Sequence, residues 1–334
     1  MAKSGPMSRK ALVIKLGVSV ALMAFLVWKV DWQESLRTLL RISIPWIPVL
    51  LFISVILNLL SCVKWQLFLR ERGNEVPLWR LFGLYMVGYF FNNFMPGSVG
   101  GDVVRSYVLG RELKSQSSSF GSVFLERFTG FIALLGMALL AAVVNPAALK
   151  TRALVMFMVL MAFLFAGMIA FLLLKPVQQL VMYLLGLLPE KLAGKLRKFL
   201  DVVFFFRDKP RVLGVAMFWS LLFHVMTIVN TQACCNSIRV PAGFMDLAVL
   251  VPLILLVSAI PVSLNSIGIM EGSFVFFLGM AGVSPSDALS VSLVLRAKNL
   301  VMAMVGGLIF AVWHRMPGGP PAAIPADGGG GASS

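Results

Sequence analysis

Residues 91–105 read FNNFMPGSVGGDVVR, a cluster of Asn, Pro, Gly and Ser in the middle of the apolar region 78–113. Pro96 cannot continue a helix, and the glycines after it permit tight turns and close approach of a ligand to the backbone. We expect the incoming helix to end near Pro96 and a returning helix to begin near Asp102. The sequence therefore predicts a broken helical hairpin rather than a plain membrane span.

A second interruption has a similar composition. Residues 258–272 read SAIPVSLNSIGIMEG and divide the apolar region 244–283. Pro261 stops one arm, small and polar residues cross the gap, and Glu271 opens the next helix. Irregular backbone at membrane depth is tolerated only where it is buried in protein or lines a watery cavity. Both breaks are therefore predicted to be walls of a cavity.

Apolar runs dominate the rest of the chain. Of its 334 residues, 59% are hydrophobic and 13% are charged, which is more apolar than a soluble globular domain needs. Runs close to the ~20 residues that cross a bilayer occur at 11–30, 44–64, 121–144, 153–175, 211–235 and 287–313. The predicted fold is an all-α polytopic membrane protein with six full spans and two broken re-entrant helical hairpins.

The charged minority is basic, with 29 Lys and Arg against 14 Asp and Glu and a formal net charge of +15. With the N-terminus in the cytoplasm, 20 basic residues fall on the cytoplasmic side and six on the opposite side. Only Arg127, Arg296 and Lys298 remain inside spans. This distribution follows the positive-inside rule and predicts that both termini are cytoplasmic. It accounts for the basic excess without nucleic acid as a partner.

The two halves of the chain repeat one another in segment order. The spans at 44 and 211 start 167 residues apart, Pro96 and Pro261 are 165 apart, and the spans at 121 and 287 start 166 apart. Each unit is span, span, broken hairpin, span, and the two units have opposite orientations. This is the inverted-repeat architecture of alternating-access transporters. The alternative is that the spacings coincide by chance.

The sequence divides into four regions. A basic cytoplasmic N-terminus (1–10) precedes the first membrane repeat (11–144), and the second membrane repeat follows (153–313). The second repeat contains an interfacial segment (178–206), whose Leu, Phe, Lys and Arg residues suit a helix along an anionic leaflet. The Pro- and Gly-rich tail (317–334) is predicted to be disordered.

The first break is predicted to bind an anion. The half-helix that begins near Asp102 points unpaired N–H groups into the membrane interior, which favours a group such as a lipid phosphate. Arg105, one turn further on, adds a fork of donors suited to phosphate. The alternatives are structural: Asp102 is an ordinary helix N-cap, and Arg105 snorkels or pairs with Asp102.

Ionisable residues also occur in the second break and in the spans that follow the hairpins. Glu271 has three interpretations: it caps its helix, it pairs with Arg296 or Arg127, or it couples transport to protons. Glu126 and Arg127 lie in the span at 121–144, whereas Arg296 and Lys298 lie in the last span. Charges inside a membrane are costly unless they are paired or hydrated, so these side chains are predicted to face a central cavity. For Lys298 we expect a structural, mutually satisfied contact.

Metal and redox chemistry are not expected. Cys62, Cys234 and Cys235 lie in apolar runs, and the chain contains only His224 and His314 as histidines. These are too few ligands for a disulfide framework or a His/Cys zinc site. No metal or other cofactor is predicted, and no catalytic cluster is evident.

The two breaks carry a family resemblance. NNFMPGSVGGDVVRSYVLGR (92–111), followed by ERFTG (126–130), and SAIPVSLNSIGIMEG, followed by an arginine in the last span, resemble the lysylphosphatidylglycerol synthase transmembrane-region family, whose members are flippase-like. The resemblance covers residues 10–315. By this resemblance the family's motif positions are Pro96, Gly100, Gly101, Asp102, Arg105, Glu126, Arg127, Pro261, Gly268, Glu271 and Arg296. The polar residues Asn93, Ser263 and Asn265 complete the predicted substrate-binding set.

The resemblance implies movement of lipids, including aminoacylated phospholipid, across the bacterial inner membrane, and relatives are linked to hopanoid or polyprenyl lipids. The synthases of the family carry a soluble aminoacyl-transferase domain after the membrane region. We expect this chain to be a stand-alone member that does not make the lipid by that route. The predicted function is translocation of an anionic or phosphate-bearing lipid by a multi-pass protein of the bacterial inner membrane.

Two other functions stay open at this point. One is a polytopic enzyme acting on lipid-linked substrates, with Asp102 and Glu271 as acid and base. The other is a membrane accessory protein without transport. The predicted partners are membrane lipids with an anionic head group, and a homo-oligomer or a lipid-biosynthesis partner is also considered.

Overall fold

The computed structural model describes Gly17 and residues 31–94, 100–144, 152–187, 189–260 and 262–314. The predicted N-terminal region 1–10, the first span (11–30, except Gly17), Pro96, Pro261 and the tail 317–334 lie outside the described residues. Among the described residues all regular elements are helical, as the all-α prediction requires. The helices are α2 (Trp32–Leu40), α3 (Trp46–Glu71), α4 (Leu78–Phe94), α5 (Gly100–Glu112), α6 (Gln116–Val144), α7 (Arg152–Leu173), α8 (Lys175–Leu185), α9 (Glu190–Phe204), η2 (Phe205–Asp208), α10 (Pro210–Ser237), α11 (Phe244–Ser258), η3 (Leu264–Ser266), α12 (Ile269–Met280) and α13 (Pro285–His314).

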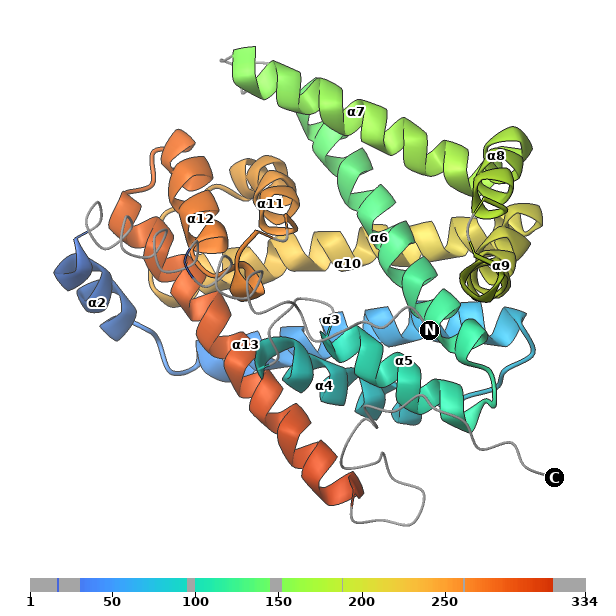
Figure 1. Cartoon of the computed structure of the whole chain (residues 1–334). Helices are drawn as coiled ribbons and strands as arrows, with labels where there is room; N and C mark the ends of the chain where they lie inside the picture. Colours follow the sequence, from blue (N-terminus) through green and yellow to red (C-terminus); the bar gives the residue numbers. More distant parts are fainter. Residues whose placement is uncertain are drawn as a thin grey trace.

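α3 and α10 lie side by side along the length of the fold (Figure 1). α3 begins after Pro45 and ends at Glu71. Arg72 caps it, and Gly73 then takes a φ of 74° and turns the chain. α10 begins with Pro210, at a position where a helix needs no N–H donor. Both helices are apolar around most of their circumference, as expected of helices surrounded by protein and lipid.

The two broken regions form two pairs of packed helices, α4 with α5 and α11 with α12. In the first pair Gly101 lies against Gly88, and a Cβ added to Gly101 would lie 1.7 Å from the carbonyl oxygen of Gly88. In the second pair the chain turns through left-handed backbone at Asn265, Ser266 and Gly268. The helix pairs predicted at 78–113 and 244–283 are therefore present.

One long helix follows each pair and also packs against the other pair. α6 contacts both α5 and α11, and α13 contacts both α12 and α4. α6 and α13 cross α3 and α10 obliquely (Figure 1). Where α13 meets α4, a Cβ on Gly306 would lie 2.0 Å from the carbonyl oxygen of Met86, so a small residue permits the close approach of the two helices.

Smaller helices lie at the two ends of the molecule, with α2 at one end and α8 and α9 at the other (Figure 1). α7 passes into α8 through a bend of 83°. The predicted interfacial segment 178–206 is therefore two helices, the end of α8 and α9. α2 was not predicted. Asp31 caps this helix by accepting hydrogen bonds from the N–H groups of Gln33 and Glu34. Thr38 of α2 donates a hydrogen bond to Asp287 of α13.

Four of the described helices are long and apolar enough to cross a membrane, namely α3, α6, α10 and α13, and the bent pair of α7 and α8 would make a fifth. The spans predicted at 44–64, 121–144, 211–235 and 287–313 thus correspond to single helices. The span predicted at 44–64 was too short, because α3 continues to Glu71. As a result Lys64, which was counted as cytoplasmic, is a buried residue within α3.

Candidate functional site

A central cavity of about 400 Å³ lies between α3, α4, α6, α10, α11, α12 and α13. Its wall is unusually polar for the interior of an apolar chain. The polar and charged side chains of the wall are Ser54, Asn58, Tyr85, Tyr89, Asn92, Asn93, Arg127, Thr227, Asn230, Thr231, Ser258, Asn265, Ser266, Arg296, Lys298 and Asn299. Both breaks contribute, and the Asn265 side-chain N–H donates to Oδ1 of Asn93 over 3.5 Å.

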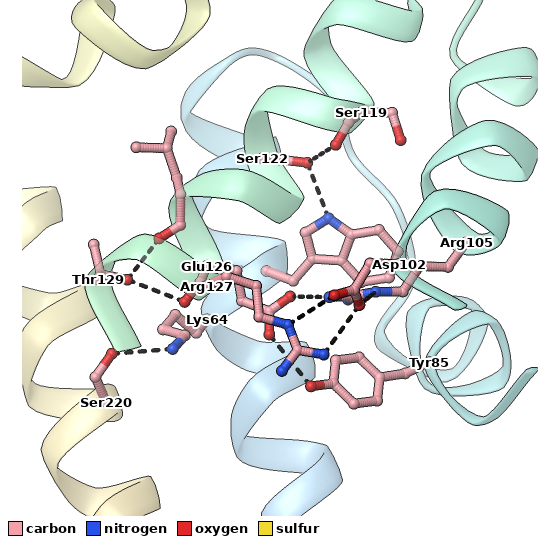
Figure 2. Close-up of polar contacts among 12 residues, drawn as sticks. Lys64, Tyr85, Asp102, Arg105, Ser119, Ser122, Glu126, Arg127, Thr129 and Ser220 are labelled. Atoms are coloured by element: carbon pink, nitrogen blue, oxygen red, sulfur yellow. Dashed lines mark hydrogen bonds and ion pairs between the residues drawn. The ribbon is translucent and has the colours of Figure 1, made fainter. Parts of the chain in front are cut away.

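The first break carries an ion-pair network at the start of α5 (Figure 2). Asp102 lies in the first turn of α5 and accepts hydrogen bonds from Arg105 Nε at 3.0 Å and from Arg127 Nη2 at 3.0 Å. Arg127 Nε is 3.1 Å from the other carboxylate oxygen of Asp102. Arg105 Nη2 in turn lies 2.7 Å from Glu126 Oε2. Two arginines therefore share two carboxylates between α5 and α6.

The two arginines of this network differ in accessibility. The side chain of Arg105 is 1% exposed, and its guanidinium lies over the rings of Trp65 and Tyr85 at 4.6 and 4.4 Å from their centroids. The side chain of Arg127 is 53% exposed. Because Arg105 does not line the central cavity and Arg127 does, Arg127 is the arginine of this network that can reach a ligand there.

The second break has an ion pair like that of the first, between a carboxylate in the first turn of a helix and an arginine of the next helix. Glu271 lies in the first turn of α12, and Arg296 Nε of α13 is 2.5 Å from its Oε1. The other carboxylate oxygen accepts the N–H of Gly268 at 2.7 Å, so Glu271 also caps its own helix. Asp102 and Arg127 are separated by 25 residues, and so are Glu271 and Arg296.

Two buried lysines have neutral partners. Lys64 of α3 donates to Ser220 Oγ of α10 at 3.0 Å, and Lys298 of α13 donates to Asn230 Oδ1 of α10 at 2.9 Å. Within the described part of the chain neither ammonium forms an ion pair with a carboxylate. These contacts satisfy hydrogen bonds with neutral groups, and Lys64 also lines a cavity together with the carboxylate of Glu126.

The N-terminus of α5 is held by the helix that precedes it. Asn92 of α4 accepts the N–H of Gly101 at 2.7 Å, which satisfies one of the first N–H groups of α5. The approach is possible because Gly88 and Gly101 have no side chains where the two backbones meet. Local sequence, a Pro/Gly break flanked by Asn and Asp, thus produces both the helix start and its cap.

Residues 12–307 match the family described as the lysylphosphatidylglycerol synthase TM region. The chain belongs to this family. It is also similar to UPF0104 membrane proteins along nearly its whole length. One from Methanothermobacter thermautotrophicus is 24% identical, covering 92% of this chain and 94% of the relative, and one from Pyrococcus horikoshii is 22% identical, covering 90% and 96%.

Family membership and the apolar helices together identify a multi-pass membrane protein. The predicted recognition of the lysylphosphatidylglycerol synthase TM region family is confirmed. These relatives come from archaea, and their names state membrane association but no activity.

The structure places the predicted site residues in two groups. The residues that line the central cavity are Asn93, Arg127, Asn265 and Arg296. The residues that support these from behind or alongside are Gly100, Gly101, Asp102, Arg105, Glu126, Gly268 and Glu271. Ser263 is buried and lines a neighbouring cavity with Asp102. Pro96 and Pro261 lie outside the described residues.

The structural alternatives weighed for Arg105 and Glu271 describe contacts that are present. Asp102, by contrast, is the third residue of α5 rather than the residue before the helix, and its carboxylate bonds to Arg105 and Arg127. Arg105 pairs with Asp102, as one interpretation held, and it also pairs with Glu126. Glu271 is both a helix cap and the partner of Arg296. Direct contact of Arg105 with a head group, and proton coupling through Glu271, stay predictions.

Several cavity residues were missed by sequence reasoning. Asn58 and Asn230 are single amides inside long apolar helices, and Tyr85 and Tyr89 are spaced one helical turn apart on α4. An amide or hydroxyl within a predicted span was the available signal, because burial of such a group in lipid is costly without a partner. Lys298 makes a structural contact of the kind expected, with Asn230, and it also lines the cavity.

Proposed function

We propose that this protein translocates a lipid with an anionic, phosphate-bearing head group across the membrane. The observation that carries the proposal is the charge of the central cavity: Arg127, Arg296 and Lys298 line it, and its described lining contains no Asp or Glu. Ligand sites combine apolar walls with a few convergent polar groups, and this cavity has both.

The charge balance of the surrounding helices supports an anionic ligand. The buried or cavity-facing cations are Lys64, Arg105, Arg127, Arg296 and Lys298, whereas the carboxylates among them are Asp102, Glu126 and Glu271. An uncompensated charge inside a membrane protein is expensive. A phosphate in the central cavity would offset part of the excess and would accept hydrogen bonds from the arginines.

The packing of the two halves supports an inverted repeat. The helix contacts α3–α4, α4–α5 and α5–α6 have counterparts in α10–α11, α11–α12 and α12–α13. The Asp102–Arg127 pair corresponds to Glu271–Arg296 with the same separation in sequence. We infer two repeats with six spans and two re-entrant hairpins, related by a pseudo-two-fold axis between α3 and α10. Such repeats underlie alternating access to a central site.

We further propose that the cytoplasmic end of the molecule is the one with α8 and α9. The predicted cytoplasmic basic residues include Arg197, Lys198 and Arg211 at this end, and α2 lies at the other end (Figure 1). The inner leaflet is anionic and attracts exposed basic side chains. Both termini would then be cytoplasmic, in the plasma membrane of the cell.

Reconstitution tests the function. Proteoliposomes that contain phosphatidylglycerol labelled on one acyl chain with a dithionite-reducible fluorophore report head-group movement between leaflets. We expect the protein to accelerate this movement. Arg127→Gln and Lys298→Gln each remove a charged donor worth about 1.5–3 kcal/mol, so each should slow movement roughly 10- to 100-fold. Arg211→Gln, at an exposed site outside the cavity, is the matched control and should leave the rate unchanged.

Each other outcome has a defined meaning. Mass spectrometry of the recovered lipid detects a chemical change, and a converted lipid would identify an enzyme instead. No movement and no conversion would favour a non-transporting accessory protein. Equal rates for the wild-type protein, Arg127→Gln and Lys298→Gln would remove the central cavity from the pathway.

A further inference from the structure

Two more cavities flank α6 next to the central cavity. One, of about 480 Å³, lies between α3, α6, α7 and α10, and we call it the α7 cavity. The other, of about 550 Å³, lies between α5, α6, α9 and the chain after α11, and we call it the α9 cavity. Among the described residues, Arg127 is the one side chain that lines the central, α7 and α9 cavities together.

The two flanking cavities are largely apolar. The α7 cavity is walled by Phe128, Phe131, Leu134 and Met168, and the α9 cavity by Val103, Phe120, Val123 and Phe199. Phe124 and Ala259 line both cavities and so lie between them. The polar side chains that line each cavity beside Arg127 include Lys64, Glu126 and His224 in the α7 cavity and Asp102, Ser106 and Ser263 in the α9 cavity.

We propose that the substrate is a phospholipid with two acyl chains, bound with its phosphate at Arg127, one chain in the α7 cavity and the other in the α9 cavity. The head group beyond the phosphate lies in the central cavity. This inference rests on the proposed function, because it specifies the substrate of the same site. It distinguishes a two-chain phospholipid from single-chain lipids, which would fill one flanking cavity and leave the other without a chain.

The geometry of Arg127 fits a phosphate at the junction. Asp102 accepts hydrogen bonds from its Nε and Nη2, and Nη1 has no acceptor among the described contacts. The guanidinium is held in place by this pair, while about half of the Arg127 side chain stays exposed. A phosphate bound there would lie where the apolar α7 and α9 cavities meet. The two acyl chains of a glycerophospholipid could then extend from the phosphate end of the molecule into the two cavities.

The lining of the central cavity also limits the head group. Its amides, which include Asn58, Asn92, Asn230 and Asn299, offer both donors and acceptors, which suits hydroxyl groups. Lys298 and Arg296 would repel an ammonium, and the described lining holds no carboxylate to pair with one. We therefore assign a neutral, hydroxyl-bearing head group such as glycerol or a sugar, rather than a cationic aminoacyl group.

Photo-cross-linking tests this placement without a transport readout. A benzophenone amino acid is introduced in place of Val103 in the α9 cavity, Met168 in the α7 cavity, or Val312, which is exposed on α13, as a control. Each purified protein is irradiated in detergent with dioleoyl phosphatidylglycerol, its single-chain lyso form, its lysyl ester, or phosphate-free dioleoylglycerol. Intact-protein mass spectrometry gives the cross-linked fraction.

We expect phosphatidylglycerol to cross-link at positions 103 and 168 at least 10-fold above the level at 312. The lyso form should lose most of the signal at one of the two positions, and the lysyl ester and dioleoylglycerol should lose most of it at both. Arg127→Gln should reduce both signals about 10-fold or more, whereas Arg127→Lys, which keeps the charge, should retain part of them.

The proposal is overturned if the lyso form matches phosphatidylglycerol at both positions, or if a folded Arg127→Gln variant cross-links as well as the parent protein. If Arg127→Gln does not fold, the comparison of the four lipids decides, with benzophenone at position 103 or 168 and Arg127 retained. Failure here with lipid movement intact in proteoliposomes would reject the two-chain placement and leave the proposed function standing. The expected cross-linking pattern without lipid movement would support the two-chain placement and reject the proposed translocation.

Discussion

Arg105 and Arg127 contact the same carboxylate, yet their surroundings assign them different roles. Arg105 is enclosed by Trp65 and Tyr85 and holds the buried Glu126, so it positions the start of α5 against α6. Arg127 uses Asp102 as an anchor and presents the rest of its guanidinium to three cavities. A positioning arginine and a ligand-facing arginine should respond differently to the same substitution.

Arg105→Gln should lower the free energy of unfolding more than Arg127→Gln does. Loss of Arg105 leaves Glu126 buried without its cation, and breaking a buried pair in this way costs about 3–5 kcal/mol. After Arg127→Gln, Asp102 still has Arg105 at 3.0 Å, so the cost should be clearly smaller. Thermal unfolding of the detergent-purified variants, with Arg211→Gln as an exposed control, measures the order. Equal shifts for Arg105→Gln and Arg127→Gln would contradict the assignment.

At the scale of elements, the backbone contact between Gly88 and Gly101 decides how α4 and α5 can pack. A Cβ at position 101 would lie 1.7 Å from the Gly88 carbonyl oxygen, which leaves no room for any side chain there. The same contact places Gly101 N–H on Asn92 and so fixes the start of α5. The two arms of the first pair are thus joined at their backbones and should move together.

Gly101→Ala is expected to destabilise the protein by about 1–3 kcal/mol or more, because α5 must shift away from α4. Gly279→Ala in α12 is the matched control, since a Cβ there meets nothing within 4 Å. It should change stability by less than about 1 kcal/mol, the difference in helix propensity. Thermal unfolding and the yield of monodisperse protein report both variants. A tolerated Gly101→Ala would show that the packing of α4 on α5 is looser than described.

The sequence was informative wherever a local signal marks an element. Pro and Gly clusters predicted both breaks, and Asp102 and Glu271 marked the first turns of the helices that follow the breaks. Glu271 acts on its own backbone by accepting the N–H of Gly268, which is a local signal. The partners of these carboxylates were less predictable. Glu126 bonds to Arg105 and Tyr85 only because α6 presents that face to α4 and α5, which depends on tertiary packing.

Other elements escaped prediction for physical reasons. α2 has nine residues and a polar face, so its stability comes from docking onto α13 rather than from its own pattern. The end of α3 was placed seven residues too early, because a lysine was taken as the end of the apolar run. Lys64 can lie inside the helix because Ser220 of α10 accepts its hydrogen bond, and no local signal reveals that partner.

At the scale of the whole molecule, the proposed orientation makes a labelling prediction. Cys62, Cys234 and Cys235 are buried, so single added cysteines can be read above a low background. A membrane-impermeant maleimide added to intact spheroplasts should label Arg41→Cys and Arg239→Cys, which are exposed near α2 and after α10. Glu75→Cys and Asp208→Cys should be labelled only after lysis, because their loops are proposed to be cytoplasmic.

The control for this experiment is a membrane-permeant maleimide, which should label all four positions. Labelling of position 75 or 208 in intact cells would reverse the orientation and, with it, the location of α8 and α9. Labelling of 41 and 75 from the same side would contradict a single crossing by α3. The two results have different meanings. The first would place each end of the molecule on the side of the membrane opposite to the proposed one, and the second would show that α3 does not cross it.

The 25-residue spacing of the matched ion pairs has a consequence for biosynthesis. α6 and α13 carry charges that each cost about 2.5–3.5 kcal/mol when a lone helix enters the bilayer centre. For Arg127 and Arg296 the compensating carboxylate lies in the preceding helix, on α5 or α12, and so leaves the ribosome first. We expect each helix pair to remain beside the insertion machinery until the next helix arrives, so that each half enters the membrane as one unit with its charges already paired.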